Sequence, residues 1–124
     1  ISKIFFGTEC GLSLTYWYGA IISPGFPDQN YPNSFTCTWL IQLPIGEFVK
    51  VNFINFELEA SFDCLRIYDG NSDQSSMLGK FCGNSLPSSV VSSTNEMFLK
   101  FQTDSSVNKK GFMIRYSPKS RLSS

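Results

Sequence analysis

The sequence contains no histidine. Catalysis by a Ser–His–Asp or Cys–His arrangement, histidine metal sites and the usual proton shuttle at neutral pH all require this residue. No nucleophile motif compensates for its absence. We therefore predict that the protein is not an enzyme.

Neither basic nor acidic residues are in excess. Lys and Arg together number 10, as do Asp and Glu, so the formal net charge is zero. The basic footprint of a nucleic-acid-binding protein is therefore missing. The chain also lacks an apolar run of about 18 residues and a signal peptide, as in a mature or excised piece. We expect no nucleic-acid partner and no direct insertion into a membrane.

Cysteine is scarce, and none lies in the close Cys-x-x-Cys pair that zinc ribbons and thioredoxin-like sites require. The four cysteines are Cys10, Cys37, Cys64 and Cys82. Two disulfides fit them better than a metal site, and disulfides indicate a secreted, luminal or ectodomain location. Pairing each cysteine with its nearer neighbour, Cys10 with Cys37 and Cys64 with Cys82, has the lowest loop-closure cost. Spacing alone leaves all three pairings open.

The apolar residues of the chain suffice for one packed domain. The 124 residues are 42% hydrophobic and 15% aromatic, which is enough apolar material for a single core. We place this domain at residues 10–117. Residues 1–9 are predicted to be an N-terminal extension or an added edge strand, and residues 118–124 a polar C-terminal linker.

Short apolar segments broken by turn residues predict an all-β sandwich without a long helix. Strands are expected at 18–23, 36–43, 48–56, 65–68, 78–82, 90–91, 97–102 and 112–116. Four aromatic residues are expected in the core: Trp39, Phe53, Phe101 and Phe112. Four others lie beside proline and glycine and are expected to be partly exposed: Tyr16, Trp17, Tyr18 and Tyr31.

Three carboxylates occur where strands are expected to meet loops: Glu59, Asp63 and Asp104. Oxygen ligands of this kind suit calcium, which also accepts backbone carbonyls. The segment from Asp69 to Asp73 is a rival calcium loop. It fails because Gln74 and Lys80 stand where such a loop requires glycine and glutamate, so a hairpin loop is the better interpretation.

Several short motifs follow one another in a characteristic order: Cys10-Gly11, Tyr18-Gly19, Ile22 to Pro27, Tyr31-Pro32-Asn33, Cys37-Thr38-Trp39, Phe56 to Glu59, Ile67 to Gly70, Phe81-Cys82-Gly83, Asp104, Gly111-Phe112 and Tyr116. In this order they resemble the CUB domain family over residues 10–117. The resemblance implies a two-sheet antiparallel jelly-roll sandwich in an extracellular binding module. It also implies disulfides Cys10–Cys37 and Cys64–Cys82.

The resemblance further implies one calcium ion held by Glu59, Asp63 and Asp104, with backbone carbonyls of Ser106 and Val107 completing the shell. Carboxylate oxygens of Glu59 and Asp104 would then bind a lysine or arginine of an extracellular partner protein, with Tyr18 beside that basic side chain.

One feature departs from the family pattern. Cys64 directly follows Asp63, whereas the family usually places this cysteine three residues before the aspartate. The disulfide could therefore pre-organise Asp63 or pull it away from the metal.

Two other functions compete with this hypothesis. The first is a metal-independent adhesion or carbohydrate-binding domain of the spermadhesin type, with recognition by the aromatic residues Tyr16 to Tyr18. The second is a structural role, in which the segment Ile4 to Phe6 contacts a neighbouring module or a second copy.

Overall fold

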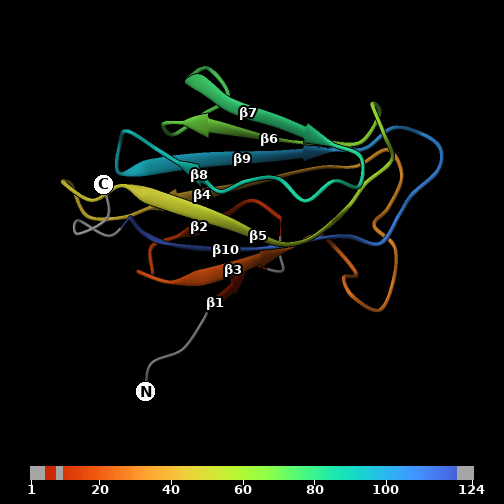
Figure 1. The fold of residues 1–124 in the computed structure, drawn as a ribbon, viewed down its shortest axis with the longest axis horizontal. Coiled ribbons are helices and arrows are strands. Elements are labelled where there is room, and N and C mark those ends of the chain that lie inside the picture. Colours follow the sequence, from red (N-terminus) through yellow and green to blue (C-terminus); the bar gives the residue numbers. More distant parts are fainter. Residues whose placement is uncertain (1–4, 8–9, 120–124) are drawn as a thin grey trace.

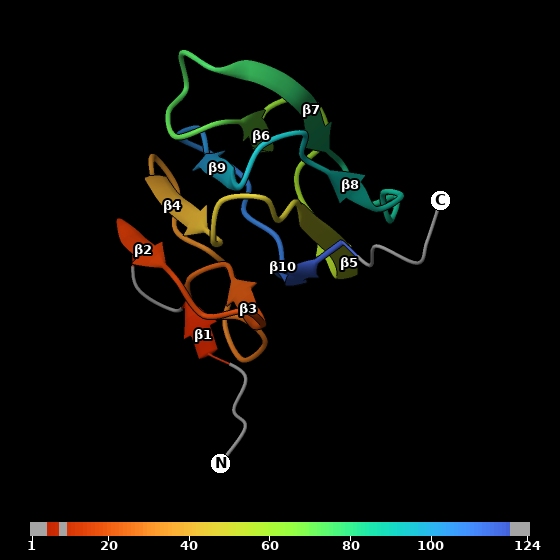
Figure 2. The same cartoon turned by 90° about the vertical axis from the view of Figure 1, so that its left-hand side faces the viewer.

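A computed structural model describes residues 5–7 and 10–119 of the chain. These residues form two five-stranded sheets packed face to face (Figures 1 and 2). The strands are β1 (Phe5–Gly7), β2 (Leu12–Leu14), β3 (Gly19–Ile22), β4 (Thr36–Gln42), β5 (Val49–Glu57), β6 (Cys64–Asp69), β7 (Ser76–Cys82), β8 (Val90–Val91), β9 (Glu96–Gln102) and β10 (Gly111–Pro118). The predicted all-β sandwich is confirmed. Within the described ranges, no helix is long and apolar enough to cross a bilayer.

The two sheets interleave strands from the whole chain. The first sheet has the order β1-β3-β10-β5-β8, and the second has the order β2-β4-β9-β6-β7. All pairings are antiparallel except β1 with β3 and β2 with β4, which are parallel. Neighbouring strands therefore come from distant parts of the sequence, which brings loops from those parts to the same end of the sandwich.

The core follows from the alternation of side chains along each strand. In β4, Cys37, Trp39 and Ile41 point inward and are at most 1% exposed. The ring of Phe112 on β10 lies edge-on to Trp39 and to Phe101, with centroid separations of 6.0 and 5.1 Å. All four aromatic residues predicted for the core are buried.

The expected exposure of the other aromatic residues is confirmed for three of the four. Tyr16, Trp17 and Tyr18 are 56%, 46% and 58% exposed. The prediction for Tyr31 is wrong, because its side chain is fully buried. Its ring packs edge-on to Phe101 at 5.1 Å, so its loop folds back over the core.

Both disulfides join the neighbouring cysteines, Cys10 with Cys37 and Cys64 with Cys82. Cys64 and Cys82 face each other directly across β6 and β7. Each bridge closes a short loop, of 27 and 18 residues in sequence separation. The pairing that had the lowest closure cost, and that the family resemblance implied, is the one observed.

The ends of the domain differ in detail from the expected boundaries. β1 pairs with β3 as an edge strand, and β2 was not anticipated. β10 extends to Pro118, and the Lys119 N–H donates a hydrogen bond to the Phe48 carbonyl at 2.7 Å. Of the predicted contact segment Ile4 to Phe6, Ile4 lies outside the described residues, as do residues 1–3, 8–9 and 120–124.

Candidate functional site

Three loops meet at one end of the sandwich, on the right of Figure 1: residues 23–35, 58–63 and 103–110. Hydrogen bonds join the first loop to the third. The Ser34 N–H donates to the Asp104 carbonyl at 2.6 Å, and the Tyr31 N–H donates to the Lys109 carbonyl at 3.2 Å. The Thr103 hydroxyl donates to the Pro32 carbonyl at 2.9 Å. These bonds fix loops 23–35 and 103–110 relative to each other.

Asp63 lies at the centre of this end and is fully buried. One of its carboxylate oxygens accepts a hydrogen bond from the Tyr31 hydroxyl at 2.7 Å, and the other accepts one from the Asp104 N–H at 2.9 Å. The Tyr31 oxygen in turn accepts from the Glu59 N–H at 3.1 Å. Asp63 thus ties all three loops together, because each of its bonds reaches a different loop.

The structure brings the three predicted acidic residues together. Carboxylate oxygens of Glu59, Asp63 and Asp104 lie within 4.8 Å of one another. The Oε1 atom of Glu59 is buried and has no hydrogen-bond partner. An unpartnered buried carboxylate oxygen is costly, and a cation would relieve that cost. The geometry therefore fits a metal ion with oxygen ligands.

The electrostatics of the cluster agree with this geometry. Burial raises the pKa of the Glu59 carboxyl above its ordinary value of 4.5, and the charges of Asp104 and Asp63 raise it further. The nearby charge of Lys109 acts in the opposite direction. Burial also raises the pKa of the Tyr31 phenol, and the hydrogen bond to Asp63 adds to this shift. Tyr31 therefore stays protonated and acts as a donor to Asp63.

The raised pKa of Glu59 predicts an unusual pH dependence of stability in calcium-free buffer. A carboxyl whose folded pKa exceeds its unfolded value binds its proton more tightly in the folded state. The free energy of unfolding should therefore fall as the pH rises from 4.5 through the raised pKa. The pKa values of Asp69 and Asp73 are lowered below 3.8, so their contributions change only at lower pH. Urea unfolding in chelator across this range measures the slope.

Glu59→Gln serves as the matched variant in this experiment, because its amide does not titrate. Its free energy of unfolding should lack the fall that the titration of Glu59 produces. An equal slope in the variant and the unmodified protein would assign the pH dependence to another group.

Cys64 leaves the acidic cluster intact despite its unusual position. Asp63 lies in the cluster while the adjacent Cys64 bonds Cys82. Successive residues at a strand start point to opposite sides. Leu65 is in the core and Arg66 is not, so the alternation places Cys64 on the side of Arg66, where it is only 3% exposed, while Asp63 points inward.

The expectation that Tyr18 flanks the acidic cluster is wrong. Tyr18 precedes Gly19, which pairs with Tyr116 near the end of β10. Asp104 lies in the loop before Gly111, at the start of β10. The two residues are therefore at opposite ends of the sandwich, because β3 and β10 run antiparallel.

Tyr31 is the aromatic residue that contacts the cluster, and sequence reasoning missed this role. The segment Tyr31-Pro32-Asn33 was one of the matching motifs, but it has no periodicity that would predict where the ring of Tyr31 points. Ser106 and Val107 lie in the loop after Asp104 and are exposed. The Ser106 N–H donates to Asp104 at 3.2 Å. The roles of the Ser106 and Val107 carbonyls as ligands stay predictions.

The two aspartates of the rejected calcium loop, Asp69 and Asp73, make other contacts. Asp69 accepts hydrogen bonds from the backbone and hydroxyl of Ser93 and from the Thr94 hydroxyl. Asp73 forms an ion pair with Lys100 at 3.2 Å. Both carboxylates thus stabilise the hairpin that joins β6 to β7 and its contacts with neighbouring segments.

The family model of the CUB domain matches residues 10–116. The chain belongs to the CUB domain family. It is 39% identical over 113 residues to the dorsal-ventral patterning protein tolloid of Drosophila melanogaster, covering 88% of this chain and 10% of that protein. It is 38% identical over 113 residues to human tolloid-like protein 1, covering 88% of this chain and 11% of that protein.

Solved structures show the same fold. The full extracellular region of zebrafish Gpr126/Adgrg6 matches with a TM-score of 0.78 and 38% identity, over 90% of this chain and 15% of that one. The MASP-1 CUB2 domain bound to Ca²⁺ matches with a TM-score of 0.77 and 28% identity, over 87% of this chain and 98% of that one. The chain spans only between 10% and 19% of the length of tolloid and several other curated relatives. CUB domains are non-catalytic interaction modules.

Proposed function

We propose that this CUB domain is an extracellular protein-interaction module whose acidic cluster binds one calcium ion. The observation that carries the proposal is the approach of three carboxylates to within 4.8 Å, together with the buried, unpartnered Oε1 of Glu59. The calcium named in the MASP-1 CUB2 structure supports the same assignment.

Glu59, Asp63 and Asp104 are the residues that would hold the ion, with carbonyl oxygens of Ser106 and Val107 as further ligands. Calcium takes six to eight oxygens and tolerates irregular geometry, so these groups and water suffice. The ion would offset the mutual repulsion of the carboxylates and order the loops that carry them. An affinity of about 0.1 to 1 mM is expected for an extracellular module.

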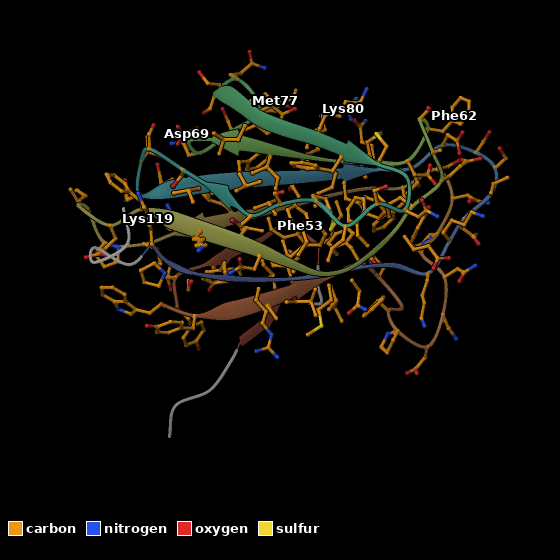
Figure 3. The ribbon with its side chains drawn as sticks, in the orientation of Figure 1. Phe53, Phe62, Asp69, Met77, Lys80 and Lys119 are labelled. Atoms are coloured by element: carbon orange, nitrogen blue, oxygen red, sulfur yellow. A yellow bond between two sulfur atoms is a disulfide. The ribbon has the colours of Figure 1, made fainter. Side chains whose placement is uncertain are left out.

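The partner is proposed to be a protein that presents a lysine or arginine. Glu59 and Asp104 are half-buried, so each residue keeps some surface open to solvent. Their remaining oxygens would accept charge-assisted hydrogen bonds from the basic side chain. Phe62 and Val107, which are 64% and 52% exposed, lie on the same two loops (Phe62 is labelled in Figure 3). Their apolar surfaces would contact the methylene stem.

The calcium proposal predicts the outcome of a calorimetric titration of the oxidised domain. The unmodified protein should bind one calcium ion, and Asp104→Ala should lose that binding because one of three carboxylates is removed. Glu57→Ala is the matched control, since Glu57 is an exposed carboxylate near the same loop but outside the cluster. Absence of binding by the unmodified protein at about 5 mM calcium would contradict the proposal.

Recognition of a basic side chain is tested separately with N-acetyl-lysine methylamide as the probe. When the probe is added, the amide chemical shifts of loops 58–63 and 103–110 should change in calcium buffer and stay constant in chelator. Equal shifts in both buffers would contradict a calcium-dependent site.

A metal-independent carbohydrate-binding role is the second candidate. It is supported by the exposure of Tyr16, Trp17 and Tyr18 at the opposite end of the sandwich. Exposed aromatic rings of this kind supply contact area at low entropic cost. A glycan array in chelator should then show binding that Trp17→Ala removes. An array without hits would contradict this role.

A further inference from the structure

The outer face of the second sheet carries three basic side chains in one row across the strands. Arg66 on β6 is directly opposite Lys100 on β9 and Lys80 on β7. The residues on either side of them, such as Leu65, Leu99 and Phe81, pack toward the core, so the basic residues point outward. Neighbouring strands lie about 4.8 Å apart, so the row spans about 10 Å.

The charge of this row is only partly neutralised. Lys100 pairs with Asp73 at 3.2 Å. The Arg66 guanidinium donates to the Gln102 side-chain oxygen at 3.1 Å, which leaves its charge uncompensated. Within the described part of the chain, no carboxylate pairs with Arg66 or Lys80. Like charges directly opposite each other destabilise a sheet, so this arrangement carries a cost in the free domain.

An apolar row lies next to the basic one on the same face. Phe98 is opposite Leu40 on β4 and Tyr68 on β6, and Tyr68 is opposite Met77 on β7. The rings of Tyr68 and Phe98 are 6.2 Å apart. Met77 is 51% exposed, Phe98 is half-buried and Tyr68 is only 6% exposed, so Met77 and Phe98 supply the open apolar surface of this row. Figure 3 shows Met77 and Lys80 together on β7, at the upper margin of the molecule.

We propose that this face, the outer side of β9, β6 and β7, docks a protein segment that carries acidic residues interleaved with apolar ones. Arg66 would bind a carboxylate of that segment with two parallel hydrogen bonds, and Lys80 would pair with a second carboxylate. Met77 and Phe98 would contact the apolar side chains. The partner thus supplies the negative charge that the domain lacks at this row.

The apolar row favours such a segment over a sulfated polysaccharide. A sulfated chain presents charge and hydroxyls, so it would cover Met77 and Phe98 without a favourable apolar contact. An acidic and apolar segment uses both rows at once. This face is separate from the acidic cluster, so the proposal is independent of calcium binding.

NMR titration with defined probes tests the proposal on the disulfide-bonded domain. The probes are an eight-residue peptide alternating glutamate and leucine, the same peptide with serine in place of leucine, and a heparin fragment. The glutamate–leucine peptide should shift amides of β6, β7 and β9 and bind at least about five-fold more tightly than the serine peptide. Tighter binding of the heparin fragment at this face would overturn the proposal in favour of a sulfated polysaccharide.

Charge variants separate docking from general attraction. Lys80→Glu and Arg66→Glu should each weaken the binding of the glutamate–leucine peptide by about five-fold, because an ion pair with the peptide is replaced by repulsion. Asp73→Asn should strengthen binding by about two-fold, because it frees Lys100. Lys50→Glu on β5 of the first sheet makes the same charge change elsewhere and should have no effect. An equal loss in Lys50→Glu, or no gain in Asp73→Asn, would overturn the proposal.

Discussion

Replacing Asp63 with asparagine is expected to abolish the stabilisation of the domain by calcium. Calcium at about 10 mM and a dissociation constant of about 0.3 mM would stabilise the native state by about 2 kcal/mol. For a domain of this size, that corresponds to a rise in Tm of about 8 °C. Asp63→Asn removes the central carboxylate but keeps one side-chain acceptor for its two donors, the Tyr31 hydroxyl and the Asp104 N–H. Its Tm should be the same in calcium and in chelator.

The matched control for this measurement is Asp28→Asn. Asp28 is an exposed carboxylate in the loop 23–35, outside the acidic cluster. The same chemical change there should preserve the full calcium-dependent rise in Tm. Retention of half or more of that rise in Asp63→Asn would show that Asp63 is not a ligand.

Truncation of Phe112 to alanine is expected to cause the largest loss of stability of any single change considered for this protein. Phe112 is fully buried and contacts the rings of Trp39, Phe101 and Phe56. Removing a buried phenylalanine costs about 3 to 5 kcal/mol, because transfer energy is lost and a cavity remains. A domain with a total stability of about 5 to 15 kcal/mol would be close to unfolding. Urea unfolding followed by tryptophan fluorescence measures this effect.

Phe62→Ala provides the comparison for the core truncation. The Phe62 side chain is 64% exposed, so its loss should change the free energy of unfolding by no more than about 0.5 kcal/mol. A cost below about 1 kcal/mol for Phe112→Ala would mean that neighbouring rings collapse into the space.

The proposed calcium site and the basic row divide possible interactions between two surfaces. The acidic cluster lies at the end where loops 23–35, 58–63 and 103–110 meet. The row of Arg66, Lys80 and Lys100 lies on the outer face of the second sheet. With a net charge of zero, the chain separates its charges locally. One domain could therefore bind a basic side chain at one surface and an acidic segment at the other.

The strands and the core were predictable because side-chain alternation is a local property. Trp39 and Phe112 lie in segments whose apolar residues recur every second position, and both are buried. Glu59, Asp63 and Asp104 were selected because family motifs and strand ends mark them, and the structure places them together. Strand β2 escaped prediction because its three residues, Leu-Ser-Leu, are too few to show a period, whereas the two-residue β8 was marked by consecutive valines.

The effect of Cys64 could not be decided from its position in the sequence. The outcome depended on which side of β6 each residue faces and on the register that places Cys64 opposite Cys82. Register is a property of paired strands, so a single segment does not reveal it. The structure shows that the disulfide and the buried Asp63 coexist.

The sequence by itself determined the all-β class, the family, the four bonded cysteines and the identity of the acidic residues. Those features depend on residue type, spacing and order along the chain. Only the tertiary structure decided that Tyr31 is buried against Asp63, that Tyr18 lies at the far end, and that Arg66, Lys80 and Lys100 form one row. These relations join residues far apart in sequence through antiparallel pairing, which local periodicity does not encode.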